Sequence, residues 1–236
     1  MDEEPRAASR ALAPRTLFLA WPLAAGAGFL ALALYGTGPT SSVEIELTRA
    51  VQAADPAPAR WSAEFMTALG NEPWFSLLAF SAVAAIFFWA RRPSLAAFLA
   101  VAVGLRALSP VLKAIVDRPR PDAQVVEVAS TLGSPSYPSG HVLGATLLFG
   151  FAMYCAERTI AAVPLRRAVQ GGLLALIVLM GHARVELGHH WPSDVLGGWL
   201  VGALLVAALI WAHRRWERPA QVDAVAAADD LERSMS

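Results

Sequence analysis

Long runs of apolar residues alternate with short polar segments along most of the 236-residue chain. A bilayer core of about 30 Å is crossed by about 20 helical residues. Six apolar stretches come close to that length, and each predicts a membrane-spanning helix: 16–36, 74–90, 94–112, 140–155, 168–183 and 193–212. The apolar run of the first stretch is longer than that of a typical signal peptide, and five more stretches follow it. We therefore interpret the first stretch as a retained helix.

A longer polar and apolar segment, 37–73, separates the first two predicted helices. Its apolar residues recur at helical spacing on both sides of Pro56 and Pro58: Val43, Ile45, Leu47 and Val51 before them, and Trp61, Phe65, Met66 and Leu69 after them. This pattern fits either two short amphipathic helices in the outer membrane interface or a lid packed over the bundle. The chain thus divides into an N-terminal tail, 1–15, a membrane domain, 16–213, and a C-terminal tail, 214–236. Residues 219–236 are small, polar and acidic, which predicts disorder.

The composition supports a membrane protein of the all-α class. The chain is 56% hydrophobic and 16% charged, whereas soluble domains average about 45–50% apolar and about 25% charged residues. Its formal net charge is zero, which argues against nucleic acid as a partner. Cys155 is the only cysteine, so an intrachain disulfide and a cysteine metal cage are excluded. We expect a six-helix bundle in the cell membrane, and the composition leaves its oligomeric state open.

The distribution of basic residues predicts the orientation of this bundle. With the N-terminus in the cytoplasm, twelve of the 19 lysine and arginine residues fall in cytoplasmic segments and six in outer segments, while Arg106 lies within a helix. Cytoplasmic loops are generally the ones enriched in basic residues. Both termini are therefore predicted to be cytoplasmic. Most of the outer basic residues gather in the loops that carry the candidate chemistry, which places the active site on the outer side.

Three polar clusters lie at the predicted outer ends of the last four helices. They are 113–121, 138–141 and 184–194. Lys113, Arg120 and Arg184 can converge on one surface, and the guanidinium group matches phosphate oxygens in a bidentate manner. Ser139 and Gly140 open a helix, whose first N–H groups and positive dipole end favour an anion. The clusters therefore predict a phosphate-binding site.

The third cluster adds a reactive group to this site. His190 and Asp194 are four residues apart, and Pro192 suits the first turn of a helix, so the two side chains can share one face. A carboxylate on one imidazole nitrogen fixes the tautomer and leaves the other nitrogen as a nucleophile or base. His141, at the start of another helix, can oppose His190. Together the two histidines suit acid–base cleavage of a phosphoester.

The three clusters read Lys-x6-Arg-Pro, Pro-Ser-Gly-His and Ala-Arg-x5-His-x3-Asp. Over about 80 residues they resemble the signature of the type 2 phosphatidic acid phosphatase (PAP2) superfamily. The resemblance implies that His190 attacks phosphorus and forms a phosphohistidine, that Asp194 orients it, and that His141 protonates the leaving oxygen. It also implies a metal-free and cofactor-free site, with the phosphate held by Lys113, Arg120, Ser139, Gly140 and Arg184. The chain departs from the family at Ala183, where the pattern has a serine whose hydroxyl could support the site.

The predicted function is a membrane phosphatase that acts on a lipid phosphate or diphosphate at the outer leaflet. Polyprenyl diphosphate, phosphatidic acid and phosphatidylglycerophosphate are the candidate substrates. Two other functions stay open: a lipid phosphotransferase, and a non-catalytic protein that binds or transports a lipid phosphate. A serine hydrolase based on Ser139 lacks the G-x-S-x-G elbow. A metal site built from the neighbouring histidines and acids lacks an H-E-x-x-H spacing and is surrounded by arginines.

Three further polar residues near the clusters, Arg118, His189 and Arg106, are not assigned to phosphate binding or catalysis. We expect Arg118 to pair with Asp117 or with lipid headgroups. His189 is interpreted as a bystander, because it points away from its neighbour His190 on a helix or turn. Arg106 lies seven residues before Lys113 and therefore on the same helix face. An ionisable residue inside a membrane helix is a functional candidate, and a structural ion pair is the alternative.

Overall fold

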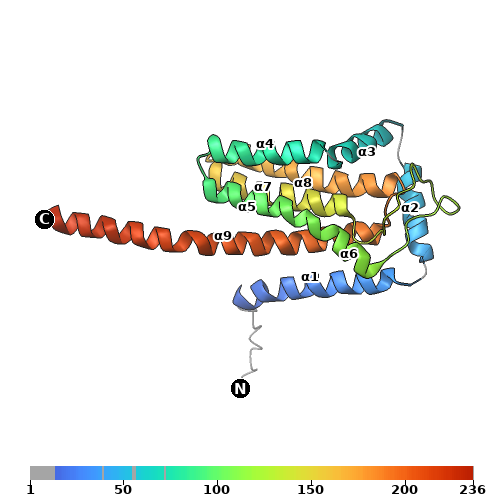
Figure 1. Cartoon of the computed structure of the whole chain (residues 1–236), viewed down its shortest axis with the longest axis horizontal. Coiled ribbons are helices and arrows are strands. Elements are labelled where there is room, and N and C mark those ends of the chain that lie inside the picture. Colours follow the sequence, from blue (N-terminus) through green and yellow to red (C-terminus); the bar gives the residue numbers. More distant parts are fainter. Residues whose placement is uncertain (1–13, 39, 55–56, 72, 236) are drawn as a thin grey trace, which may run out of the picture.

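The computed structural model describes residues 14–38, 40–54, 57–71 and 73–235, with the side chains of 14–20, 57–60 and 218–235 left aside. All regular elements of these residues are helices. They are α1 (Pro14–Gly36), α2 (Ser42–Ala54), α3 (Ala57–Gly70), α4 (Trp74–Phe88), α5 (Pro93–Gly104), η1 (Leu105–Ala107), α6 (Leu108–Val116), α7 (Gly140–Thr159), α8 (Val163–Glu186) and α9 (Pro192–Met235). The long helices run side by side, and α2 lies across one end of the bundle (Figure 1).

Helix α7 forms the centre of the bundle. It contacts α5, α8 and α9, while α1 packs on α9, α3 on α8 and α4 on α5. Leu143, Leu147, Leu148 and Phe151 of α7 are completely buried. A helix that contacts other helices on all sides does not need a continuous apolar face toward lipid. This central position explains why α7 carries much of the core.

The predicted third span, 94–112, is interrupted by a short 3-10 turn. α5 ends at Gly104, η1 follows, and α6 starts at Leu108. Pro110 lies four residues after Arg106, so it lacks the N–H that would bond the Arg106 carbonyl, and its ring collides with that carbonyl in a regular α-helix. Pro110 thus accounts for the break and for its place at Arg106. α6 ends at Val116. The next residue, Asp117, has a left-handed backbone (φ 47°), and its N–H donates to the Lys113 carbonyl at 2.8 Å.

All six predicted apolar stretches are helical, but fewer of them meet the length and hydropathy expected of a membrane span. Among the described residues, the helical stretches Pro93–Val116, Val163–Glu186 and Pro192–Glu217 do so. A fourth candidate is the pair formed by α3 and α4, which is bent by 66°. The all-α membrane fold is therefore supported, and the count of six spans stays a prediction.

The structure describes part of the two predicted tails and most of the segment 37–73. Most of the predicted N-terminal tail, 1–13, lies outside the described residues. α9 continues to Met235 through the segment predicted to be disordered, and the side chains beyond Glu217 are outside the described part. Within 37–73 two helices form, α2 and α3, while their place in the outer interface or in a lid stays a prediction. α2 buries Glu44 and Thr48 against the bundle and exposes Val43 and Leu47, so its polar face is the one that meets the protein.

Candidate active site

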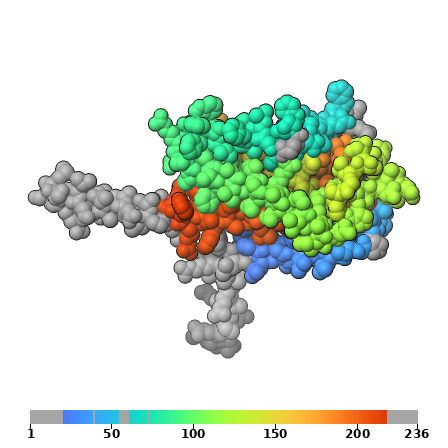
Figure 2. All heavy atoms as spheres, viewed as in Figure 1, coloured from blue at the N-terminus to red at the C-terminus, as the bar shows by residue number. Residues whose placement is uncertain are grey.

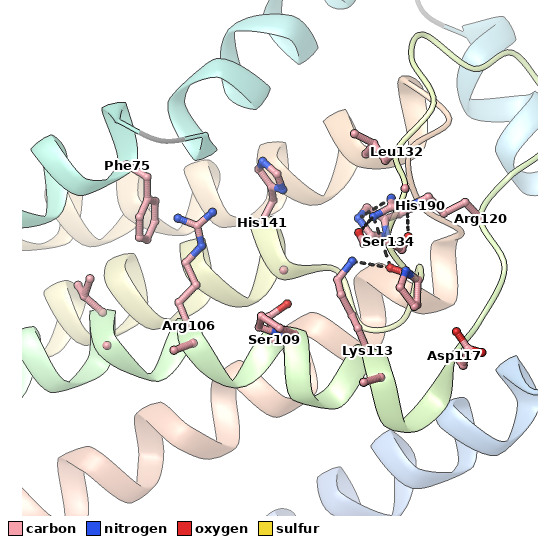
Figure 3. A pocket seen from close by; sticks show the side chains of 18 of the residues that line it. Phe75, Arg106, Ser109, Lys113, Asp117, Arg120, Leu132, Ser134, His141 and His190 are labelled. Atoms are coloured by element: carbon pink, nitrogen blue, oxygen red, sulfur yellow. Dashed lines mark hydrogen bonds between the residues drawn. The ribbon is translucent and has the colours of Figure 1, made fainter.

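The predicted site residues gather around a cavity of about 1170 Å³ at the end of the bundle where α2 lies. The cavity is bounded by α6, by the start of α7 and by the loop 117–139, which forms the surface at this end of the molecule (Figure 2). Five of the predicted residues line it: Lys113, Arg120, Gly140, His141 and His190. Figure 3 shows Lys113 rising from α6 toward His190, with His141 on the other side of the same space.

Two cations fix the long loop over this cavity. Lys113 Nζ donates to the carbonyl of Pro135 at 2.6 Å. Arg120 Nε donates to the carbonyl of Ser134 at 2.6 Å, and its Nη1 donates to the carbonyl of His189 at 2.5 Å. Burial lowers the pKa of Arg120 below its usual value, with the Asp194 charge opposing the shift. Both side chains therefore lie at the cavity wall, where their remaining N–H groups can meet an anion.

His190 is oriented by contacts on one of its two ring nitrogens. Its Nδ1 lies 3.3 Å from Ser136 Oγ and 3.4 Å from Asp194 Oδ2. Its Nε2 faces the cavity, 3.4 Å from Arg120 Nη1. Burial lowers the pKa of His190 to about 4; Asp194 opposes this effect, and the charges of Arg120 and Lys113 add to it. The imidazole is thus neutral near pH 7, with the nitrogen that can attack phosphorus directed into the cavity.

The loop before α9 holds His190 by its backbone. The N–H groups of His189 and His190 both donate to the Arg184 carbonyl at 3.1 Å. Gly188 has a φ of +62°, and a Cβ atom there would lie 1.9 Å from the carbonyl oxygen of Glu127. Only glycine fits this close approach. The turn therefore depends on Gly188 to bring His190 back toward the end of α8.

Asp194 is completely buried and has several partners besides His190. Its carboxylate accepts hydrogen bonds from Ser136 Oγ and from the Trp191 N–H, the latter at 2.8 Å. Arg118 Nη1 donates to Asp194 Oδ1 at 2.6 Å. A carboxylate held on both oxygens keeps one orientation toward the imidazole. Ser136 was not a predicted site residue, although it directly precedes Tyr137 and the Pro-Ser-Gly-His motif.

Arg118 pairs with two buried carboxylates, whereas the sequence predicted Asp117 or lipid headgroups as its partners. It is 3% exposed and connects Asp194 with Glu44 of α2. Glu44 is 4% exposed and also accepts from Ser193, from the N–H at 3.2 Å and from Oγ at 2.5 Å. The prediction was wrong because a buried carboxylate 74 residues earlier supplies a stronger partner than Asp117 or a lipid headgroup.

Arg184 and Ser139, both predicted to hold phosphate, are buried beside the cavity. Arg184 is 1% exposed, and its Nε and Nη2 atoms have no hydrogen-bond partner among the described residues. Ser139 Oγ is likewise buried with no partner in the described part of the chain. Buried donors are normally satisfied, so these atoms indicate a polar ligand. Ser139 is also the residue before the first turn of α7, whose early N–H groups have no intrahelical partners.

His141 lies across the cavity from His190, at the start of α7. Its Nε2 is 2.8 Å from Asn71 Oδ1, and a Cβ atom on Gly70 would lie 2.5 Å from its Cδ2. A carbonyl oxygen accepts hydrogen bonds, so Nε2 carries the hydrogen and Nδ1 is left to exchange a proton. Asn71 was not a predicted site residue, and it comes from the turn between α3 and α4.

The remaining predicted alternatives can be placed on the same geometry. His189 turns away from the cavity, and its Nε2 lies 2.9 Å from Ser130 Oγ. Within the part of the chain that the structure describes, no three histidine, cysteine or acidic side chains group as ligands for a metal ion. His190 contacts the hydroxyl of Ser136, while Ser139 Oγ forms no hydrogen bond with any residue that the structure describes. A serine nucleophile at Ser139 activated by His190 is therefore not formed.

Comparisons with known proteins match this arrangement. The model of the PAP2 superfamily matches residues 94–218. Phosphatidylglycerophosphatase B of Bacillus subtilis is 32% identical over 173 residues, which cover 67% of this chain and 82% of that protein. The putative undecaprenyl-diphosphatase YbjG of Escherichia coli is 38% identical over 89 residues, 35% of this chain and 40% of that protein.

Solved structures give the same result for the fold. The transmembrane PAP2 type phosphatidylglycerolphosphate phosphatase from Bacillus subtilis superposes with a TM-score of 0.74 at 25% identity, covering 84% of this chain and 98% of that one. LpxE of Aquifex aeolicus superposes with a TM-score of 0.59 at 21% identity, covering 72% and 96%. With the family match over more than half of its length, this chain belongs to the PAP2 superfamily and is a membrane lipid phosphatase of the PAP2 type.

Proposed function

We propose that this chain hydrolyses the terminal phosphate of a lipid phosphate or diphosphate through a phosphohistidine formed on His190. The observation that carries the proposal is the state of His190. Its Nδ1 contacts Asp194 and Ser136, and its Nε2 faces a cavity lined by cations. Two of the similar proteins named above are a phosphatidylglycerophosphatase and a putative undecaprenyl-diphosphatase. Phosphatidylglycerophosphate and a polyprenyl diphosphate are accordingly the first substrates to test, with phosphatidic acid as the third.

In the proposed first step, the lone pair of His190 Nε2 forms a bond to phosphorus. The bond between phosphorus and the leaving oxygen breaks, and that oxygen takes a proton from His141. Lys113, Arg120 and Arg184 stabilise the charge on the phosphoryl oxygens, with Ser139 and the α7 N–H groups as further donors. Asp194 stabilises the positive imidazole ring that forms when Nε2 attacks.

The second step releases phosphate and restores both histidines. His141, now neutral, takes a proton from a water molecule, whose oxygen attacks phosphorus. The P–N bond to His190 breaks, and inorganic phosphate leaves. Every proton in this cycle moves between water, His141 and the leaving oxygen. No step needs a metal ion, and we propose that the reaction is metal-independent.

The membrane arrangement follows from the same proposal. The cavity lies at the end of α6 and at the start of α7, which the distribution of basic residues places on the outer side. We propose six spans, cytoplasmic termini and an active site that faces outward. α2, with Val43 and Leu47 exposed, would then lie in the outer interface.

The test is phosphate release by the purified protein in lipid nanodiscs, with EDTA present and no added acceptor. His190→Ala should abolish release while the lipid phosphate still binds. His189→Ala is the matched control, because that side chain turns away from the cavity; it should keep its activity. Full activity of His190→Ala would overturn the nucleophile, and loss of wild-type activity in EDTA would overturn metal independence. Release that depends on an added acceptor would indicate a phosphotransferase, and binding without release a non-catalytic protein.

A further inference from the structure

One cation of the cavity has no part in the reaction just described. Arg106 lies at the 3-10 break between α5 and α6, inside an apolar helical stretch that is long enough to cross a membrane. It lines the same cavity as Lys113, His141 and His190. A charged group at such a depth is costly unless it faces a polar cavity or a partner. Arg106 meets this condition, because it faces the cavity that also holds His141 and His190.

The structure holds the Arg106 guanidinium beside His141. Arg106 Nη2 donates to the carbonyl of Gly70 at 3.0 Å. The ring of His141 approaches the same Gly70, because a Cβ atom there would lie 2.5 Å from His141 Cδ2. Figure 3 shows Arg106 pointing to the side of His141 that is away from His190. The guanidinium therefore adjoins the proposed general acid on the leaving-group side.

Neighbouring residues keep the side chain in this extended position. The guanidinium carbon lies 4.3 Å from the centre of the Phe75 ring, a distance typical of a cation–π contact. A Cβ atom on Gly144 would lie 3.1 Å from Arg106 Cδ, so the missing side chain leaves room for the arginine. A cation that is already ordered loses little conformational freedom when it binds an anion. Arg106 is thus preorganised toward the cavity.

Lys113 and Arg106 divide the cavity between two anionic groups. They are seven residues apart on one helix face, which is roughly 10 Å along the axis at about 1.5 Å per residue. Lys113 is at the His190 end, and Arg106 is beyond His141. A phosphoryl group attacked by His190 therefore meets Lys113, whereas a second phosphate on the leaving group would meet Arg106.

We propose that Arg106 binds a second phosphate group of the substrate, next to the leaving oxygen, and so selects lipids with two phosphates over lipids with one. The inference rests on the proposed function. In a polyprenyl diphosphate the second phosphate bears the leaving oxygen itself, and in phosphatidylglycerophosphate a glycerol bridge separates the two. Both place negative charge on the lipid side of His141. A phosphate monoester such as phosphatidic acid has no charge there.

The test compares two pairs of lipids with matched tails. One pair is polyprenyl diphosphate and polyprenyl monophosphate, and the other is phosphatidylglycerophosphate and phosphatidic acid. Arg106→Gln should lower kcat/KM for the two-phosphate member at least about tenfold, equal to about 1.4 kcal/mol, and change the one-phosphate member less than about threefold. Arg106→Lys should restore part of the preference. The pair that responds identifies the spacing of the two phosphates. Equal losses on both members would show a structural role and overturn the proposal, as would no loss on either.

Two controls separate this inference from neighbouring explanations. Arg49→Gln removes one positive charge from an exposed position on α2 outside the cavity, so it should leave the preference unchanged. Binding is also measured directly, by titrating the same four lipids into His190→Ala with and without Arg106→Gln. This measurement needs no turnover. If the wild-type protein releases no phosphate, the proposed function fails, while weaker binding of only the two-phosphate lipids still supports the Arg106 site. Equal binding of both classes in that background overturns the site independently.

Discussion

The buried cluster behind Asp194 gives the sharpest quantitative prediction. Arg118 lies between the carboxylates of Glu44 and Asp194, and all three side chains are at most 5% exposed. Replacing Arg118 with glutamine leaves two carboxylates facing each other without a cation. Removal of one partner from a buried ion pair typically costs about 3–5 kcal/mol. For a chain of this size about 1 kcal/mol corresponds to roughly 2–4 °C, so we expect Arg118→Gln to lower the unfolding temperature by about 6–20 °C.

A second substitution tests whether the balance of charge is the cause. Glu44→Gln in the Arg118→Gln background removes one of the two uncompensated carboxylates, so the double variant should be more stable than Arg118→Gln alone. Arg158→Gln is the matched control. It breaks an Arg–Glu pair of similar length, to Glu217, in which Arg158 is 36% exposed. Such a half-exposed pair contributes about 0–1 kcal/mol, so that variant should unfold close to the wild-type temperature.

The assay is thermal unfolding of the detergent-solubilised variants, followed by intrinsic tryptophan fluorescence, with turnover measured below the transition. Arg118→Gln should also lower kcat about 10- to 100-fold, the range typical for partners that orient a reactive histidine. KM should change little, because Arg118 does not line the cavity. The reasoning is refuted if Arg118→Gln unfolds at the same temperature as Arg158→Gln, or if the double variant is no more stable than Arg118→Gln.

Three further predictions follow from the site. The pKa of His190 is lowered to about 4, so its imidazole should stay neutral as pH falls from 7 to 5 and become protonated only as pH falls through about 4. Histidine NMR, with His190→Ala for assignment, measures this titration. A midpoint near the usual 6.5 would contradict the effect of burial. His141→Ala should lower lipid turnover at least about 100-fold. It should lower hydrolysis of an aryl phosphate less than tenfold, because the aryl oxygen is a good leaving group that needs no proton. Equal losses in parallel rate measurements would exclude His141 as the acid. Ser136→Ala should lower kcat about tenfold, because it removes the hydrogen bonds of the Ser136 hydroxyl to Asp194 and His190. Ala183→Ser should change kcat less than about twofold, because Ser136 already supplies a hydroxyl to this pair. A large gain in Ala183→Ser would show that the site lacks the family's serine.

Apolar stretches predicted helical segments, and short motifs named residues that the structure brings to one cavity. Six apolar runs became helices, and the three motifs brought Lys113, Arg120, His141 and His190 to one cavity. Hydropathy alone did not predict the break in 94–112, because it measures how apolar each residue is and not whether its N–H can bond. Pro110 has no N–H to donate to the Arg106 carbonyl. The signal was present in the sequence, as a proline four residues after Arg106.

Residues that reach the site from distant segments could not be predicted from spacing. Glu44 belongs to α2 and Asn71 to the turn after α3, and neither lies near a motif in sequence. α2 was interpreted by its apolar positions, and the structure buries its polar face instead. In a membrane protein the apolar face of a peripheral helix can turn toward lipid, which leaves its polar face for the protein. An exposed Leu47 beside a buried Glu44 is the expected result of that inversion.

Three cations near His190 and Asp194 act in different directions, and this difference links the stability prediction to the proposed chemistry. Lys113 and Arg120 line the cavity and help to keep His190 neutral. In the proposed mechanism a neutral imidazole attacks, and the ring becomes positive once its Nε2 is bonded to phosphorus. That positive charge needs a carboxylate which is still charged and still aligned, and Arg118 holds Asp194 from the side away from the cavity. In this mechanism two arginines separated by one proline perform opposite electrostatic tasks: Arg120 lies beside the proposed nucleophile, and Arg118 lies behind its carboxylate. If this division is correct, Arg118→Gln must impair turnover through Asp194 alone and leave phosphate binding unchanged.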